Sequence, residues 1–255
     1  MISIKNQDEI RAMREGGKIL AEVMAKLEKE IAPKKNTWEL DKLAEELVFA
    51  NAGSPAFKGY GGDADKPFPA TICASLNSEV VHGIPAKNKI MREGDIIKID
   101  IGMKYQGMFT DMARTFAVGN VSEPARKLIN VTEQSFWNGL EKLKSGNFLS
   151  EYSKAAQKCA EGDGFSVVRN LVGHGVGREL HEDPYIPNYY NKKYQDYRLE
   201  VGMTLALEPM INAGKHETVL GKDGWTFLTS DGELSAHYEN TVLITEKGAE
   251  VLTEV

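Results

Sequence analysis

The chain has 255 residues, of which 42% are hydrophobic and 27% charged, and its formal net charge is -6. This composition is typical of a globular protein with a sizeable core, and the acidic balance excludes the basic face that nucleic-acid binding requires. No apolar run approaches the ~18 residues of a membrane span, and the charged start lacks the apolar core of a signal peptide. Cys73 and Cys159 are too few and too distant for a disulfide framework, which indicates reduced thiols and a cytoplasmic protein.

Four stretches predict helices, because apolar residues recur in them at three- and four-residue steps. These stretches are 7–32, 37–52, 122–143 and 150–161. Asn6, Asn36 or Thr37, Ser122 and Ser150 are typical helix starts, and Gly53 suits a left-handed exit. Strands are predicted at 70–76, 79–84, 95–105, 107–119, 165–173, 202–214, 224–234 and 239–253. Two helices followed by strands, twice over, indicate two similar halves that share one sheet within a single domain of residues 1–255.

Residues 59–69 (GYGGDADKPFP) predict a long loop, and loops of this length are often functional. Asp63 and Asp65 within it favour a solvated loop over a calcium site, because further spaced oxygen ligands are missing.

Asp100 and Asp111 lie in two strand-like runs joined at Tyr105–Gln106, which predicts a hairpin with a two-residue turn there. In that register, residues whose numbers sum to 211 face each other, so the two carboxylates are roughly 4.5–5.5 Å apart at Cβ. Such a pair is destabilising unless a cation lies between its members. A register shifted by one residue, or a pair facing water, explains these two residues equally well.

A second group of polar residues lies in glycine-rich or apolar surroundings. His174, in GHGVG, taken alone is more typical of a glycine-rich turn with a surface histidine. Glu208 and Glu239 are each a lone acid in an apolar, strand-like run, and a buried, unpaired glutamate is rare. Together with the two aspartates they make four carboxylates and one imidazole, the ligand set expected for two divalent metals. Such oxygen-rich sites suit cobalt, manganese, iron or zinc hydrolase centres.

Six motifs in order, HGIP, IDIG, TDMARTF, GHGVGRELHEDP, LEPMINAG and SAHYENTVLIT, resemble type I methionine aminopeptidases over nearly the whole chain. The resemblance implies an α+β, pita-bread fold, in which two pseudo-symmetric αβ halves surround a curved antiparallel sheet with helices outside. It also implies a dinuclear metallo-exopeptidase that removes the initiator methionine from nascent proteins and peptides and prefers a small second residue. We expect a monomer; contact with the ribosome is left open.

The family's metal ligands match residues of this chain one by one. By resemblance, Asp100 chelates one of two divalent ions, whereas Asp111 and Glu239 bridge both. His174 and Glu208 complete the other ion's ligands, and Glu208 is also the candidate general base.

The substrate-binding residues follow from the same resemblance. His82 and His181 match histidines that hydrogen-bond the scissile amide and the tetrahedral intermediate. Cys73 and Trp225 match positions that line the methionine pocket, and Tyr60 and Phe68 substitute for aromatic residues that relatives carry before the cysteine. The chain departs from many relatives at Leu180 and Asn240, which puts the rim of the pocket in doubt.

Two alternatives stay open. A proline-directed aminopeptidase or dipeptidase of the same fold would use the same metal ligands, although such relatives usually carry an additional amino-terminal domain. A protein of this fold that has lost catalysis and binds peptides or nucleic acids would lack metal ligands, and here all of them are present.

Overall fold

The described residues of the computed structural model are 2–61 and 66–254, so that Asp63 and Asp65 lie outside them. Within these ranges the helices are α1 (Gln7–Lys29), α2 (Thr37–Ala50), α3 (Glu123–Leu140) and α4 (Ser150–Gly162). The strands of the first half are β1 (Ser54–Pro55), β2 (Ile72–Leu76), β3 (Glu79–Val81), β4 (Ile96–Tyr105) and β5 (Met108–Ala117). Those of the second half are β6 (Ser166–Val167), β7 (Gly173–Gly175), β8 (Glu182–Ile186), β9 (Thr204–Leu207), β10 (Met210–Asn212), β11 (Thr218–Leu220), β12 (Phe227–Thr229), β13 (Ser235–His237), β14 (Glu239–Thr245) and β15 (Gly248–Val251).

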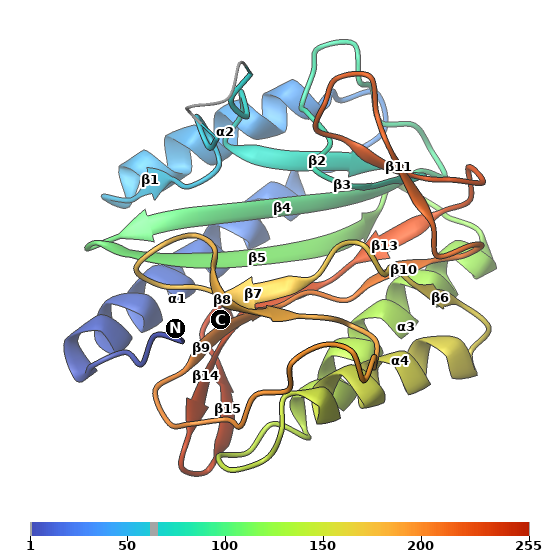
Figure 1. The fold of residues 1–255 in the computed structure, drawn as a ribbon. Coiled ribbons are helices and arrows are strands. Elements are labelled where there is room, and N and C mark those ends of the chain that lie inside the picture. Colours follow the sequence, from blue (N-terminus) through green and yellow to red (C-terminus); the bar gives the residue numbers. More distant parts are fainter. Residues whose placement is uncertain (1, 62–65, 255) are drawn as a thin grey trace.

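The strands form one large curved sheet and two small ones (Figure 1). Over the described ranges the large sheet has nine antiparallel strands in the order β1-β4-β5-β14-β9-β7-β8, with β2 paired to β4 and β15 to β14. Helices α1 and α2 pack on the β2, β4 and β5 side, whereas α3 and α4 pack against β13, β10 and β6. The predicted arrangement of two helices and strands, twice over, is therefore present.

The helix boundaries follow from side-chain capping. The Asn6 side chain accepts from the Glu9 amide while Glu9 bonds back to the Asn6 amide, and Asn36, not Thr37, caps α2. α4 starts at the predicted Ser150, but its cap position is Leu149, which gives no side-chain bond. The left-handed exit from α2 belongs to Ala52, with φ of 58°, and not to Gly53.

Alternation along β4 separates a core face from a site face. Ile97, Ile99 and Ile101 are fully buried against α1 and α2, each contributing about 1.5–3 kcal/mol of hydrophobic stabilisation. Because successive side chains of a strand point to opposite faces, Lys98 and Asp100 point away from these helices. The helix-covered face thus anchors the strand that carries Asp100.

The β4–β5 hairpin differs from the predicted register. Its turn is Gln106–Gly107, and both residues have positive φ (47° and 87°), as a type I′ turn requires. The predicted turn at Tyr105 was wrong because glycine supports this conformation far better than tyrosine. Asp100 therefore faces Ala113, and Asp111 faces Gly102. The numbers of paired residues sum to 213, two more than predicted, so both aspartates stay on one face as diagonal neighbours.

No helix in the described part of the chain is long and apolar enough to cross a membrane.

Candidate metal centre

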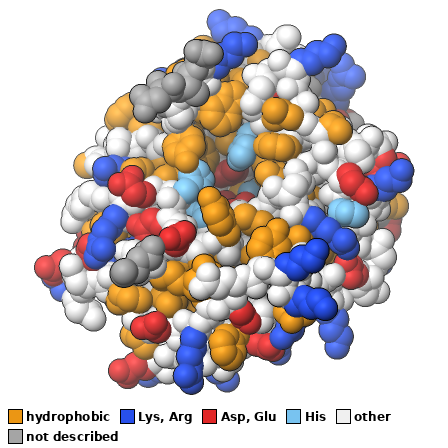
Figure 2. All heavy atoms as spheres, viewed as in Figure 1, with side chains coloured by type: hydrophobic (Ala, Val, Ile, Leu, Met, Phe, Trp, Pro, Cys, Tyr) orange, Lys and Arg blue, Asp and Glu red, His pale blue; other side chains and the backbone are white. Residues whose placement is uncertain are grey.

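The predicted site residues meet in one cavity of about 100 Å³. Figure 2 shows histidine and acidic side chains at the bottom of a hollow that hydrophobic side chains surround. The cavity is lined by Tyr60, Phe68, Cys73, His82, Asp100, Asp111, His174, His181, Glu208, Trp225 and Glu239, together with Phe57 and Leu180. The fold therefore brings together side chains that are as much as 182 residues apart (from Phe57 to Glu239).

Sheet register places all four carboxylates. Ala113 pairs with Asp100 on one side and with Glu239 on the other, so Asp100 and Glu239 lie in one row across β4, β5 and β14. Glu208 directly follows β9, whose last residue pairs with the residue after Glu239. Asp111 lies two residues before Ala113, on the same face and in the next row.

Thr241 fixes Asp111 from the neighbouring strand. Its hydroxyl accepts a hydrogen bond from the Asp111 amide at 2.8 Å and donates one to the Asp111 carbonyl at 2.9 Å. This exchange holds β5 of the first half against β14 of the second at the position of a predicted ligand.

His174 is buried on β7, so its interpretation as a surface histidine in a turn was wrong. The flanking glycines allow close strand packing, because a Cβ on Gly173 or Gly175 would lie 2.5 or 2.1 Å from a backbone oxygen. The His174 Nδ1 lies 2.8 Å from the Gly175 carbonyl oxygen, which assigns the proton to Nδ1 and leaves the Nε2 lone pair free. That Nε2 lies 3.6 Å from Oε1 of Glu208.

The four carboxyl groups are too deeply buried to ionise together unaided. Burial, and after it the charges of neighbouring carboxylates, raises the pKa of Asp100, Glu208 and Glu239 well above the ordinary value. Burial raises the pKa of Asp111 to about 7. One buried oxygen each of Asp100 and Asp111 has no hydrogen-bond partner among the described residues. Cations would satisfy these oxygens and neutralise the repulsion, so the residues fit a divalent metal centre.

Two further histidines line the same cavity as neutral groups near pH 7. Burial lowers the pKa of His82 to about 4, and burial also lowers the pKa of His181. The His181 ring lies 4.3 Å from that of His174 between centroids, and its Nδ1 lies 2.6 Å from the Tyr60 hydroxyl. Tyr60 thus orients a neutral imidazole beside the predicted metal ligands.

An apolar pocket adjoins the carboxylates. Phe68 and Trp225 contact edge to face, with centroids 5.3 Å apart, and the Trp225 indole donates to the Lys66 carbonyl at 3.0 Å. Cys73 pairs with Asp100 across β2 and β4, and burial raises the pKa of its thiol well above the ordinary value. The pocket therefore offers aromatic faces and a neutral sulfur.

His237 is a site residue that the sequence prediction missed. It is 1% exposed, and its Nε2 lies 3.6 Å from Glu208 and 4.0 Å from Glu239. Strand alternation could have found it, because positions 237 and 239 of an extended run share a face.

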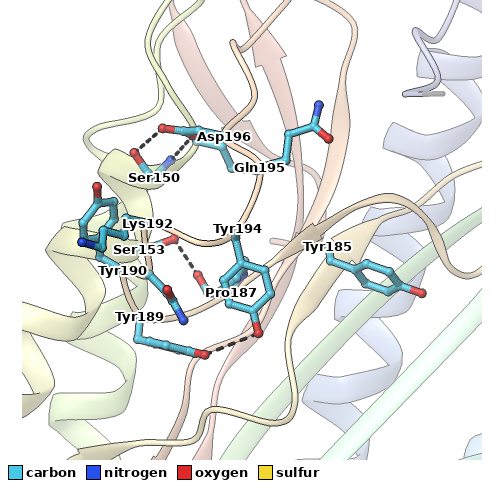
Figure 3. A pocket seen from close by; sticks show the side chains of 12 residues that line it. Ser150, Ser153, Tyr185, Pro187, Tyr189, Tyr190, Lys192, Tyr194, Gln195 and Asp196 are labelled. Atoms are coloured by element: carbon cyan, nitrogen blue, oxygen red, sulfur yellow. Dashed lines mark hydrogen bonds between the residues drawn. The ribbon is translucent and has the colours of Figure 1, made fainter.

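A second hollow, of about 120 Å³, lies between the start of α4 and the segment 185–196 (Figure 3). Tyrosines line much of it, and the Tyr189 and Tyr194 hydroxyls are 3.4 Å apart. The carboxylate of Asp196 accepts hydrogen bonds from the amide and the hydroxyl of Ser150, at 3.0 and 2.6 Å. The buried acids and histidines converge in the first cavity and not here.

The fold and the buried carboxylate–imidazole cluster define a metal-dependent hydrolase, and the chain belongs to metallopeptidase family M24, which residues 11–246 match. It is 48% identical to the methionine aminopeptidase of Clostridium acetobutylicum, over 99% of each chain. The crystal structure of the methionine aminopeptidase of Thermotoga maritima superposes with a TM-score of 0.95 at 44% identity, covering 100% of both chains. Prolidase from Pyrococcus furiosus has a TM-score of 0.79 at 25% identity, over 99% of this chain and 65% of that one. The expected family and the pita-bread fold are confirmed.

Proposed function

We propose that the protein is a methionine aminopeptidase, which hydrolyses the first peptide bond of peptides and nascent proteins that begin with methionine. The observation that carries this proposal is that a candidate metal-binding cluster and an apolar pocket lie side by side in one cavity. A cluster of buried carboxylates and imidazoles adjoins an apolar pocket lined by aromatic rings and a thiol. The pocket matches a thioether side chain, and the cluster matches two divalent cations. The names of the similar proteins support the same substrate.

The metal-binding roles are part of the proposal. Asp100 would hold one ion, Asp111 and Glu239 would bridge, and His174 with Glu208 would complete the second ion's ligands. Cobalt, manganese, iron and zinc all accept such donors. A bound metal pair supplies Lewis acidity to the scissile carbonyl and to the attacking water.

The chain's own groups then bind the substrate and move its protons. The methionine side chain enters the pocket beside Cys73 and Trp225, and the free α-amine lies on the Asp100 side. Glu208 takes the proton of the attacking water and returns it to the leaving amine. His82 and His181 hydrogen-bond the scissile amide and the oxyanion of the tetrahedral intermediate.

Specificity and location follow from the same substrate. The Tyr60 hydroxyl and the His181 Nδ1, 2.6 Å apart, form part of the cavity rim. A substrate with a small second residue fits past this rim. Because its substrates are newly made chains, the enzyme acts in the cytoplasm, where nascent proteins are its partners. We propose that it acts as a monomer.

The test uses metal-stripped protein and a Met-Ala-Ser peptide, with manganese, iron, cobalt and zinc added back separately. We expect metal-dependent release of free methionine, and no cleavage of an Ala-Pro control. Cleavage of Ala-Pro alone would assign a proline-directed peptidase, and cleavage of neither peptide by folded, metal-loaded protein would refute peptidase activity.

A matched pair of variants tests the ligand assignment. Asp111→Ala should lose bound metal and activity together, whereas Asp163→Ala, at an exposed position after α4, should lose neither. Normal metal content and activity in Asp111→Ala would remove this residue from the ligand set.

A further inference from the structure

His237 is held rigidly next to two of the carboxylates that line the cavity, Glu208 and Glu239. It ends β13, where it pairs with Met210 of β10, and its side chain is fully buried. The Thr115 hydroxyl accepts a hydrogen bond from the His237 amide at 2.9 Å and donates one to the His237 carbonyl at 2.7 Å. The backbone is thus fixed from β5, and the direction of the imidazole follows from the sheet.

Both ring nitrogens of His237 lack a hydrogen-bond partner among the described residues. Burying an imidazole in this way is costly unless something binds it. A neutral imidazole has one nitrogen with a free lone pair, which can bind a metal ion.

The spacing around His237 is too long for hydrogen bonds and suits donors that share a cation. Its Nε2 lies 3.6 Å from Oε2 of Glu208 and 4.0 Å from Oε2 of Glu239. Two donors at about 2.0–2.2 Å from one ion are roughly 2.8–4.4 Å apart for angles between 90° and 180°. The Nε2 of His174, a predicted ligand, lies 3.6 Å from the other oxygen of Glu208. Because Glu208 is assigned to the other ion, the distance that a shared ion would span is the one from His237 to Glu239.

The described residues contain two compact groups of donors that share Glu239. Asp111, His174 and Glu239 form one, and Asp100, His237 and Glu239 form the other; in each, the donor atoms lie within 4.8 Å of one another. Each group contains one imidazole.

We propose that His237 is a sixth ligand of the metal centre, supplying a nitrogen to the ion that Asp100 and Glu239 hold, so that each of the two ions has one imidazole. This inference rests on the proposed dinuclear site. Nitrogen at both ions favours zinc, iron or cobalt over manganese, which prefers an all-oxygen environment.

X-ray absorption at the cobalt edge tests the proposal on the wild-type protein loaded with two equivalents of Co²⁺. Imidazole rings give a distinctive multiple-scattering signal, and we expect about one imidazole per cobalt. A value of about one half would mean that only one histidine binds, and would overturn the proposal. Release of methionine from Met-Ala-Ser by the same sample reports separately on the proposed function, so the two can fail independently.

Variants sharpen the result. His237→Gln and His174→Gln should each halve the imidazole count, and calorimetry with Co²⁺ should show one of the two binding events weakened by about 100-fold or more. Residues that only support a ligand change metal affinity by about 10–100-fold and leave the imidazole count unchanged. His216→Gln, at a half-buried position outside the metal centre, is the control and should match wild type. His237→Gln should also reduce the preference for Co²⁺ over Mn²⁺, and an unchanged count and affinity would overturn the proposal.

Discussion

Replacing Asp111 with asparagine should stabilise the metal-free protein at neutral and alkaline pH. Burial raises the pKa of Asp111 from 3.8 to about 7 in the folded state. Between these two values the folded protein binds more protons than the unfolded chain, so its stability falls as the pH rises through this window. At about 1.36 kcal/mol per pH unit, raising the pKa from 3.8 to about 7 gives roughly 4 kcal/mol as an upper limit. Asparagine is neutral at every pH and removes this contribution.

The measurement is the free energy of urea unfolding, from pH 5 to pH 8, in the presence of a chelator. Wild type should lose several kcal/mol across this range, and Asp111→Asn should lose less. The slope should not vanish, because burial also raises the pKa of Asp100, Glu208 and Glu239. Glu246→Gln, exposed in the β14–β15 turn, should follow wild type. Parallel pH profiles for Asp111→Asn and wild type would refute the reasoning.

Three further predictions concern single side chains. Tyr60→Phe should lower kcat about fivefold to tenfold and leave Tm unchanged, because it removes the 2.6 Å contact to His181; an unchanged kcat would show that this hydroxyl does not orient the imidazole. Gly17→Ala should cost about 1–3 kcal/mol in thermal unfolding, because its Cβ would lie 2.2 Å from a backbone oxygen. Gly162→Ala, with open space around it, should be neutral or slightly stabilising, and equal losses in both would contradict the packing argument. Lys98→Met should remove a contribution that raises stability between about pH 7 and 10.5, since burial lowers the pKa of Lys98 to about 7; parallel pH profiles of urea unfolding for the variant and wild type over this range would disprove it.

The candidate ligands could be predicted because each one violates the pattern around it. A lone acid in an apolar strand marks Asp100, Glu208 and Glu239, and period-two alternation fixes the face on which each lies. Asp111 was assigned to the correct face even though its partner residue was wrong. A slip of two residues in pairing preserves every face, so the error in the turn did not affect the site.

The glycine-rich segment around His174 shows what local sequence could not reveal. Three residues are too few for an alternating pattern, and glycine is typical of turns. The reason for Gly175 is a neighbouring backbone oxygen, 2.1 Å from the position of a Cβ, which only the folded sheet brings near. His237 was missed for a related reason. Alternation could have placed it on the same face as Glu239, but its closeness to Glu208 depends on strand pairing that no local pattern specifies.

The hydrogen bonds of Thr241 to Asp111 join positions 130 residues apart in the chain, and this has a consequence for the integrity of the protein. Asp100 and Asp111 belong to the first half, whereas His174, Glu208 and Glu239 belong to the second. Cations bound among them would close this long segment into a loop, acting as a non-covalent cross-link that only the folded state can form. Neither half alone would hold the ions, so fragments should recover metal only after they reassociate. In the intact chain, amide exchange along β5 and β14 should slow when metal binds, while exchange in α2 and α4 should change least.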